Sequence, residues 1–435
     1  MGNVIIYPNK LSGQVNIPPS KSICHRAIIC GGLSNGVSNI LNVISSEDIK
    51  ATHGAMVSLG SCIKVIGRDG LSIKGAQEPQ IRGTSTSIDC IESGSTLRFM
   101  IPIALALGIK TTFYGKGKLV DRPLKPYYDI IDAQQINYSN TAGKLPVTIN
   151  GKLRPGEFKI EGNVSSQFIS GLLFALPLLQ GDSKIILTSE LQSKPYVDLT
   201  IDMLKRFSVV IEHKNYKEFT LKGNQTYKCA NYVVEGDFSQ AAFWLGADVL
   251  GSNITCLGLN IDSIQGDRAI LRIIESMGGK LSINLGGVKA FPAKPVTKDT
   301  VIDASQCPDL VPVLAVIAAL RMGTTKIINC GRLRFKESDR LAAISRELNK
   351  IGADIDENED VLIIKGKENL MGGVVNSWND HRIAMALAVA SIKCIKPLII
   401  MDSDCVKKSY PHFWEDFKKL GGIINDWNLE DKVND

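Results

Sequence analysis

A short junction that recurs along the chain constrains its fold more than any other feature: an amphipathic helix ends in a small residue, and a short β-branched strand follows. The small residues of the six copies are, in order, Gly60, Ala133, Ser208, Gly278, Gly352 and Gly421. We expect each to end its helix in the left-handed conformation, which glycine adopts most readily. Successive junctions lie roughly 70 residues apart, which is enough for a whole α/β subdomain.

Six such units divide into three and three, so the sequence predicts an α/β protein of two domains with three repeats each. The length of 435 residues favours two domains because one hydrophobic core rarely grows so large. We expect the chain to cross between the domains near residues 235–237, where a strand-like segment meets an apolar helical one. Helix–glycine–strand junctions are common in α/β proteins, so chance is the alternative interpretation, and the even spacing argues against it.

Composition and charge bear on the class of protein. The net charge of +6 is small, and aromatic residues make up only 6% of the chain, so binding of small anions is favoured over binding of nucleic acid. The ten cysteines stand singly, which predicts neither a zinc site nor a redox dithiol and suits a reducing compartment. No signal peptide is recognised, and the longest apolar run, residues 310–320, is too short to span a bilayer. We therefore expect a cytoplasmic protein.

Basic and hydroxyl residues gather at predicted helix starts. Two prolines lead into a helix whose first turn holds Lys21 and Ser22, and Arg26 projects from the same face one turn later. A lysine in the first turn is electrostatically misplaced unless an anion binds there, because the helix dipole already makes that end positive. A capped helix with solvated charges is the alternative interpretation.

Two further segments of the first half have the same character. Residues 92–96 form a small-residue turn before an apolar helix, and Gly94 would let the backbone approach an anion closely. Ser165, Ser166 and Gln167 open another apolar helix with neutral donors of the kind that bind sugar hydroxyls or phosphate. Capping of the helix by one serine explains only one of the three.

The second half of the chain repeats the pattern. In the charged segment 336–340, Ser338 is expected to cap a helix that has Asp339 in its first turn, although the charges could form a plain ion-pair network. Arg382 likewise stands at the start of an apolar helix. Further basic residues at sharp turns are Arg122 and Lys408. So many basic residues in such places predict convergent anion sites.

Taken together and in this order, these segments resemble those of the 5-enolpyruvylshikimate-3-phosphate synthases (3-phosphoshikimate 1-carboxyvinyltransferases), which belong to the enolpyruvyl transferases. The resemblance runs from Pro8 to about Leu420. It implies an α/β fold of two inside-out, barrel-like domains, each of three βαβαββ repeats, with the active site in the cleft between them. The implied domains are 20–235, which binds shikimate 3-phosphate, and 1–19 with 236–425, which carries most of the phosphoenolpyruvate-binding arginines, followed by a polar tail over 426–435.

The resemblance implies a cytoplasmic transferase of the shikimate pathway, which leads to chorismate and the aromatic amino acids. It would transfer the enolpyruvyl group of phosphoenolpyruvate to the 5-hydroxyl of shikimate 3-phosphate and release phosphate. The expected partners are these two substrates alone. No metal, organic cofactor, nucleic acid or membrane is implied, and a monomer is expected.

The resemblance also carries roles onto individual residues. Asp309 would accept the proton of the 5-hydroxyl, Glu337 would protonate the methylene carbon, and Lys21 would take part in catalysis. The residues that would bind shikimate 3-phosphate are Lys21, Ser22, Arg26, Ser165, Ser166, Gln167, Ser193, Tyr196, Asp309 and Lys336. Those that would bind phosphoenolpyruvate are Lys21, Gly94, Arg122, Gln167, Arg340, Arg382 and Lys408.

The chemistry accounts for this set of residues. Each substrate carries a carboxylate and a phosphate, so burying both needs several cations, and arginine can bind either group bidentately. The addition needs a base near the hydroxyl and an acid near the alkene carbon, which two carboxylates among cations can supply if their pKa values differ. Two closing domains would hold the reactants together and make the step effectively unimolecular.

Four positions depart from the family's pattern. Glu92 stands where many members have asparagine, and Ser95 and Phe99 stand where threonine and proline are common. These three flank the expected phosphoenolpyruvate pocket, so they bear on the affinity for that substrate and for glyphosate-type inhibitors. Arg332 stands where an asparagine often contacts shikimate 3-phosphate, so that contact is not carried over.

Two other functions stay open on the sequence alone. The sister enzyme that transfers enolpyruvate to UDP-N-acetylglucosamine shares the implied fold, but it typically uses a cysteine on a mobile loop, and the corresponding loop 115–121 has none. An inactive protein that senses the same metabolites would be favoured by loss of Asp309 or Glu337, and both are present.

Overall fold

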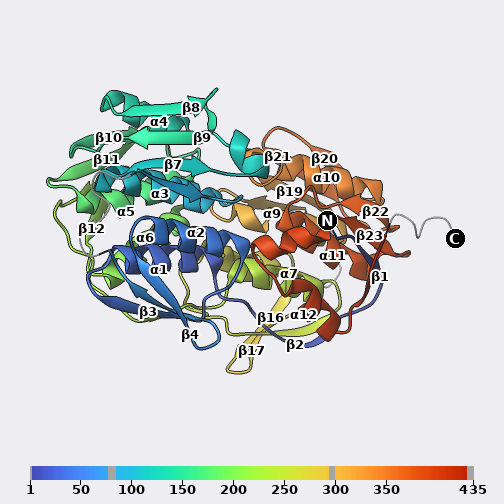
Figure 1. Cartoon of the computed structure of the whole chain (residues 1–435). Coiled ribbons are helices and arrows are strands. Elements are labelled where there is room, and N and C mark those ends of the chain that lie inside the picture. The colour runs from blue at the N-terminus through green and yellow to red at the C-terminus, as the bar shows by residue number, and fades with distance from the viewer. Residues whose placement is uncertain (1, 77–84, 293–298, 429–435) are drawn as a thin grey trace. The chain divides into compact units, whose positions relative to one another are not determined.

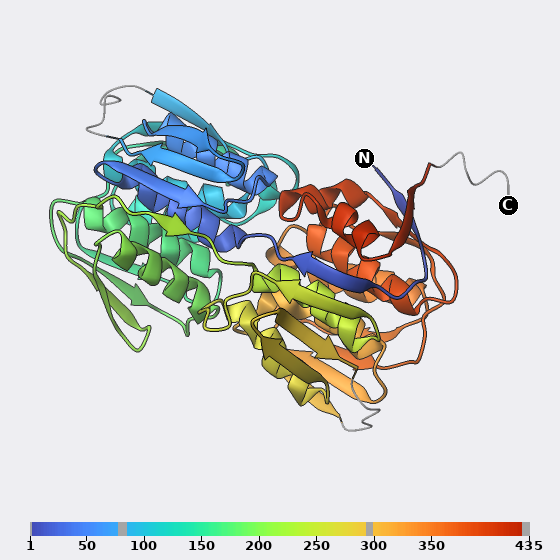
Figure 2. The same cartoon turned by 90° about the horizontal axis from the view of Figure 1, so that it is seen from below.

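The computed structural model describes residues 2–76, 85–292 and 299–428, which form two compact units (Figures 1 and 2). One unit is Pro19–Glu235, and the other is Met1–Pro18 together with Gly236–Asp435. The N-terminal strands therefore belong with the C-terminal half of the chain. Of the polar tail expected over 426–435, residues 429–435 lie outside the described ranges, and Trp427 is buried.

Each unit contains three copies of one repeat, in which two strand–helix pairs are followed by two strands. The elements of Pro19–Glu235 are α1 (Lys21–Leu33), β3 (Val37–Leu41), α2 (Glu47–Ser58), β4 (Cys62–Ile66), β5 (Gly70–Lys74) and β14 (Tyr232–Val233); β6 (Ser85–Asp89), α3 (Gly94–Leu107), β7 (Lys110–Tyr114), η1 (Gly117–Asp121), α4 (Lys125–Ala133), β8 (Asn137–Thr141) and β9 (Lys144–Asn150); and β10 (Glu157–Ile160), α5 (Ser166–Ala175), η2 (Leu176–Leu178), β11 (Ser183–Leu187), α6 (Lys194–Arg206), β12 (Ile211–Lys214) and β13 (Glu218–Leu221).

The other unit has the same three-part organisation. Its elements are β2 (Ser12–Asn16), α7 (Phe238–Val249), β15 (Asn253–Leu257), η3 (Gly266–Arg268), α8 (Ala269–Ser276), β16 (Lys280–Asn284) and β17 (Gly287–Phe291); β18 (Thr300–Asp303), η4 (Pro308–Leu310), α9 (Val311–Ala319), β19 (Thr324–Ile328), η5 (Gly331–Phe335), α10 (Arg340–Lys350), β20 (Asp354–Glu357) and β21 (Val361–Lys365); and β22 (Gly373–Asn376), α11 (His381–Ala390), η6 (Ser391–Lys393), β23 (Leu398–Met401), η7 (Ser403–Lys408), α12 (Phe413–Lys419), β24 (Ile423–Asp426) and β1 (Val4–Tyr7).

Every repeat builds a four-stranded sheet with the same pairing. In the order β6-β7-β9-β8, the first pair is parallel and the other two pairs are antiparallel, and β18-β19-β21-β20 repeats this pattern. Three sheets borrow a strand from a distant part of the chain: β14 joins β3, β2 joins β15, and β1 lies between β23 and β24. The two-domain α/β fold predicted from the sequence is confirmed.

The first helix of each repeat is buried, and this makes the units inside-out. In α7, α9 and α11 every residue is buried, and these three helices pack on one another, as α3 packs on α5 in the other unit. A helix that is apolar on all sides has no face for water, so the strands lie outside, where Figure 2 shows them running over the helices of each unit. Alternating burial, as along β7, fits strands with one side exposed.

The second helix of each repeat ends at the recurring junction. Gly60, Gly278, Gly352 and Gly421 have φ of 98°, 89°, 97° and 92°, and Ser208 has φ of 64°. In every copy the left-handed residue stands two positions beyond the last helical residue. In the second copy the prediction of Ala133 is wrong, because Ala133 is the last residue of α4 and Gln135 takes the left-handed conformation, with φ of 54°. The left-handed position is defined by its distance from the helix end, and in the second copy a glutamine occupies that position.

Candidate functional site

The predicted site residues fall in both units, and most stand at the N-terminal ends of helices. Lys21, Gly94 and Arg340 are the first residues of their helices, and Arg382 is the second residue of α11. Free backbone N–H groups and the helix dipole favour anions at such ends. Each unit is described in turn.

Lys21 is held by a carboxylate at the start of the neighbouring helix. Its Nζ lies 2.6 Å from Oδ2 of Asp48, in the first turn of α2, and both side chains are largely buried. Ser20 precedes α1 without a capping hydrogen bond from its side chain. Asp48 was not among the predicted site residues, because the helix dipole alone accounts for an acidic residue in the first turn of a helix.

Arg26 faces inward and joins α1 to α6. Its Nε donates to Oγ1 of Thr200 at 2.9 Å, and its Nη atoms donate to the carbonyl oxygens of Ser22 and Tyr196, both at 2.7 Å. The guanidinium lies 5.4 Å from the centre of the Phe99 ring. Burial lowers the pKa of Arg26 to about 10. The structure therefore gives Arg26 an organising place between two predicted site residues, and its contact with a substrate stays a prediction.

Gly94 and Arg122 lie against each other at the start of α3. Ser93 caps this helix by accepting from the Thr96 amide at 3.2 Å. A Cβ atom added at Gly94 would lie 2.5 Å from Nη1 of Arg122. Only glycine therefore allows the buried Arg122 to approach the free N–H groups of this helix start.

Gln167 links the starts of α5 and α3 through a hydrogen-bond network. Its Oε1 accepts from Nη1 of Arg98 at 2.7 Å, and its Nε2 donates to Oγ of Ser95 at 2.8 Å. Ser165 caps α5 by accepting from the Gln167 amide at 3.3 Å, which assigns one of the two adjacent serines a capping role, and Ser166 is buried beside it. Arg98, the fifth residue of α3, was not among the predicted site residues.

Ser193 and Tyr196 open α6. Ser193 is buried and left-handed, with φ of 58°, immediately before the helix. Tyr196 is partly buried against the hydrophobic core of this unit, and its carbonyl oxygen is the one that Arg26 binds. The strained turn at Ser193 thus sets where α6 begins.

In the other unit, one arginine holds three carboxylates. Arg340 is 1% exposed, and its Nε lies 2.8 Å from Oδ2 of Asp380. Its Nη1 lies 3.0 Å from Oδ1 of Asp309, and its Nη2 lies 2.6 Å from Oε2 of Glu337. Burial acts to lower the pKa of Arg340, but the three carboxylates outweigh burial and raise it. Asp380 is a further residue that the sequence reasoning did not single out.

Asp309 lies among three cations. Besides Arg340, Nη2 of Arg382 lies 3.0 Å from its Oδ2, and Nζ of Lys336 lies 3.5 Å from its Oδ1. Burial acts to raise the pKa of Asp309, but these cations outweigh burial and hold the pKa well below its ordinary value. For Lys336, burial has the larger effect and lowers the pKa. Asp309 is thus ionised at neutral pH.

Arg382 and Lys408, the other predicted phosphoenolpyruvate-binding cations of this unit, also have neutral hydrogen-bond acceptors. Arg382 donates to Oγ of Ser239 at 3.1 Å, and Lys408, 4% exposed, donates to the carbonyl oxygen of Asn379 at 2.7 Å.

The expectation that Ser338 caps a helix is wrong. Asp339 is the residue that caps α10, accepting from the Ala342 amide, and Ser338 donates to Asp380 at 3.1 Å. The carboxylate lies one residue nearer the helix and takes the capping position, which leaves the serine hydroxyl for the ion-pair cluster.

Known proteins agree with this picture along almost the whole chain. The model of the family EPSP synthase (3-phosphoshikimate 1-carboxyvinyltransferase) matches residues 6–417. The 3-phosphoshikimate 1-carboxyvinyltransferase of Clostridium kluyveri is 58% identical, with 99% of this chain and 100% of that protein covered, and that of Clostridioides difficile is 54% identical over the same shares. The chain belongs to the EPSP synthase family.

Solved structures of EPSP synthases have the same fold. Two structures of the enzyme from Acinetobacter baumannii superpose with TM-scores of 0.80 and 0.78, at 23% and 22% identity, and each covers 98% of this chain and 100% of the solved chain. Within the described ranges no helix combines the length and the apolar character needed to cross a bilayer.

The four positions that depart from the EPSP synthase pattern have distinct places. Ser95 belongs to the Gln167 network, and Phe99 is buried beneath Arg26. A Cβ atom added at Gly117 would lie 2.7 Å from Oε2 of Glu92, so Glu92 lies against the loop that precedes Arg122. Arg332 donates to the Ser305 carbonyl oxygen, which ties it to its own unit.

Proposed function

We propose that this chain transfers the enolpyruvyl group of phosphoenolpyruvate to the 5-hydroxyl of shikimate 3-phosphate and releases phosphate. The observation that carries the proposal is that Asp309 and Glu337 bind adjacent nitrogens of one buried guanidinium, Arg340. An addition across the enolpyruvyl double bond needs one group that accepts a proton and one that donates it. Two carboxylates that share a cation can be held close together in these two roles.

Asp309 is the proposed base. Its depressed pKa keeps the carboxylate ionised in the resting protein. When the anionic substrates bind, they draw on the field of the same cations, so the affinity of Asp309 for a proton rises as the reactants arrive.

Glu337 is the proposed acid, and the same reasoning applies to it. Its ion pair with Arg340 favours the ionised form at rest. A phosphate or carboxylate that competes for Arg340 weakens that pair, and added negative charge favours protonation of Glu337. Substrate binding would thus prime the acid as well as the base.

The proposed transfer takes two steps, an addition and an elimination. In the addition, the 5-hydroxyl loses its proton to Asp309, its oxygen bonds to the central carbon of phosphoenolpyruvate, and Glu337 protonates the methylene carbon to a methyl group. In the elimination, that methyl group returns a proton to Glu337 and the electrons of its C–H bond re-form the double bond. The carbon–oxygen bond to the phosphate breaks at the same time, and phosphate leaves with the electron pair of that bond and takes up the proton from Asp309. Lys21, paired with Asp48 at rest, is proposed to stabilise the negative charge of the bound substrates during both steps.

The other predicted residues are proposed to bind the substrates. In Pro19–Glu235, the proposed shikimate 3-phosphate domain, the hydroxyl and amide donors and Arg26 bind that substrate. The residues that bind phosphoenolpyruvate are Gly94 and Arg122 of that unit and Arg340, Arg382 and Lys408 of the other unit. Their positions at helix starts and turns support both assignments, because these are places where anions are stabilised.

We further propose that the protein acts as a monomer in the cytoplasm. Light scattering of the purified protein would give a mass close to 47.3 kDa if it is a monomer, and about twice that mass would refute this part.

Phosphate release tests the function. The purified protein is given phosphoenolpyruvate with shikimate 3-phosphate, with UDP-N-acetylglucosamine, or alone. Release only with shikimate 3-phosphate is expected. Release with the sugar nucleotide would move the chain to the sister activity, and release with neither, despite binding of both substrates in calorimetry, would favour a metabolite sensor.

A further inference from the structure

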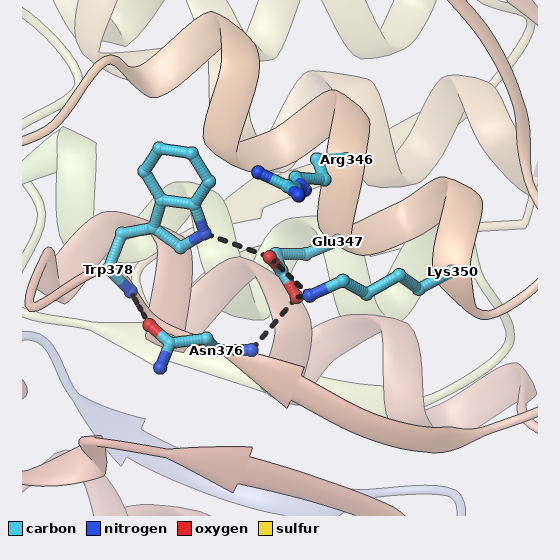
Figure 3. Close-up of a pocket in the computed structure, with 5 residues that line it drawn as sticks. All are labelled: Arg346, Glu347, Lys350, Asn376 and Trp378. Carbon is cyan, nitrogen blue, oxygen red and sulfur yellow. Dashed lines mark hydrogen bonds and ion pairs between the residues drawn. The ribbon is translucent and has the colours of Figure 1, made fainter.

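A pocket of about 450 Å³ lies between α10 and the turn that follows β22. Its lining is Arg346, Glu347, Lys350, Asn376 and Trp378 (Figure 3). None of these five was a predicted site residue. The turn leads directly to Asp380, one of the three carboxylates on Arg340, which connects this pocket to the ion-pair cluster along the chain.

Glu347 is the buried centre of this pocket. Its side chain is 1% exposed. The indole Nε1 of Trp378 donates to Oε1 at 2.8 Å, and the backbone amide of Asn376 donates to Oε2 at 2.9 Å. Nζ of Lys350 lies 2.8 Å and 2.7 Å from the two oxygens. Every partner is a donor, so only a carboxylate, which accepts at both oxygens, satisfies all of them.

The turn that Glu347 binds is conformationally costly. Trp378 and Asn379 are both left-handed, with φ of 54° and 52°. Two consecutive non-glycine residues in that region are strained and persist only where their surroundings hold them. Glu347 binds the turn at its first residue, Asn376, and again at the Trp378 ring, and Figure 3 shows both contacts converging on the one carboxylate.

The turn contacts residues that are proposed to bind phosphoenolpyruvate. The carbonyl oxygen of Asn379 accepts from Lys408 at 2.7 Å. The next residue, Asp380, caps α11 by accepting from the Arg382 amide and binds Arg340. Two of the cations proposed to bind phosphoenolpyruvate, those of Lys408 and Arg340, are therefore bound by two adjacent residues, and one of these two residues also binds the backbone of Arg382.

Glu347 also reaches that turn from the same helix as Arg340. Arg340 begins α10, and Glu347 lies about two helical turns further along on the same side. The helix and the turn are thus joined twice, by Arg340–Asp380 at one end and by Glu347–Trp378 at the other. On its other side the turn is bound through Ser377 to the backbone of Met401 and Asp402, so the contact of Glu347 with Trp378 fixes the side of the turn that faces α10.

We propose that Glu347 is a positioning residue for phosphoenolpyruvate affinity. It keeps the left-handed turn 378–379 in place and thereby fixes Lys408, Arg382 and Asp380 relative to Arg340. The inference rests on the proposed function. It adds that the affinity for phosphoenolpyruvate depends on Glu347, a residue that is not proposed to touch either substrate.

The variant Glu347→Gln tests it, because the amide has the same shape but must direct its NH₂ group at one of the donors. We expect the KM for phosphoenolpyruvate to rise about tenfold, with the KM for shikimate 3-phosphate and kcat changed less than about twofold, as for lost ground-state positioning. Arg346→Gln, an exposed change in the same pocket, is the matched control and should leave both KM values unchanged.

A double-mutant cycle shows whether the effect passes through the turn. Trp378→Phe removes the indole donor, so Trp378→Phe and Glu347→Gln together should raise the KM for phosphoenolpyruvate less than the product of the two single effects. Multiplicative effects, or equal rises in both KM values, would overturn the proposal, as would an unchanged KM in Glu347→Gln. If the wild-type protein releases no phosphate, the proposed function fails instead, and the two failures are thereby distinguished.

Discussion

The two units carry predicted site residues on the same repeat, but Arg26 and Arg98 in one unit and Arg340 in the other bind different kinds of acceptor. In Pro19–Glu235, Arg26 donates to a hydroxyl and two carbonyl oxygens, and Arg98 donates to an amide oxygen. In the other unit Arg340 binds three carboxylates at once. Neutral acceptors orient an arginine without cancelling its charge, whereas carboxylates cancel the charge and provide groups that can exchange protons.

The difference fits two kinds of task on one scaffold. The neutral acceptors of Arg26 leave its charge available to an anionic substrate, whereas the carboxylates on Arg340 are groups whose protonation can respond to the arriving charge. Because helix starts recur at the same place in every repeat, evolution could change the side chains there without changing the backbone. The following variants test this division between the units.

The largest effect is expected at the proposed base. Asp309→Asn should lower kcat about 10³-fold, since an amide cannot accept the hydroxyl proton, and general base catalysis is worth 10²–10⁴-fold. Steady-state phosphate release measures this. Asp354→Asn, on an exposed edge strand of the same unit, is the control. A kcat within tenfold of the wild type would remove Asp309 from the mechanism.

The next prediction compares how much the Arg340–Asp380 and Lys21–Asp48 ion pairs contribute to the free energy of unfolding. Asp380→Asn leaves the fully buried Arg340 with one fewer carboxylate, and breaking such a pair costs about 3 kcal/mol or more. Asp48→Asn breaks the Lys21 pair, whose side chains are 13% and 10% exposed, and should cost about 1 kcal/mol. Urea unfolding of both variants gives the comparison, and equal losses would contradict it.

A smaller effect is expected at Arg122. Arg122→Ala removes a cation at the start of α3, and we expect the KM for phosphoenolpyruvate to rise about thirtyfold, since a hydrogen bond to a charged group is worth about 2 kcal/mol. The KM for shikimate 3-phosphate should change little. Arg154→Ala, an exposed arginine of the same unit, serves as control. An unaltered KM for phosphoenolpyruvate would count against the proposed role.

The smallest effect concerns acid sensitivity, in which the units should also differ. Burial, with Lys21 and Arg26 nearby, lowers the pKa of His25 well below 6.5. Below about pH 6.5 the unfolded chain binds a proton at His25 that the folded chain does not bind. The free energy of unfolding therefore falls by about 1.4 kcal/mol per pH unit. Asp309, whose pKa is also depressed, loses its stabilising contribution only below about pH 4.

His25→Asn isolates this contribution. Asparagine keeps a hydrogen-bonding atom near Thr52, which His25 contacts at 2.7 Å, but it has no proton to gain. Urea unfolding of the wild type and the variant between pH 7.5 and 5 should show a shallower decline for His25→Asn. Parallel declines would show that His25 does not set the acid sensitivity.

Much of the architecture could be read from the junctions, because each reports a local conformation. The residue two positions past a helix end must be left-handed, and glycine marks it in four of the six copies. Where Gln135 fills that position, no small residue signals it, and the prediction was displaced to Ala133. Ser338 was misassigned for a similar reason, since either Ser338 or Asp339 could cap α10, and only the packed structure distinguishes them.

The sequence by itself determined the two-domain α/β repeat, the placement of basic residues at helix starts and turns, and the resemblance that indicates the function. These follow from local conformation and short-range order along the chain. The tertiary structure alone decided that Asp48 holds Lys21, that Asp380 shares Arg340 with Asp309 and Glu337, and that Glu347 supports the turn beside them. Apart from Glu337 and Arg340, such partners lie far apart in the sequence, and a charge becomes part of a site only when folding removes water and brings its counterpart within hydrogen-bonding distance.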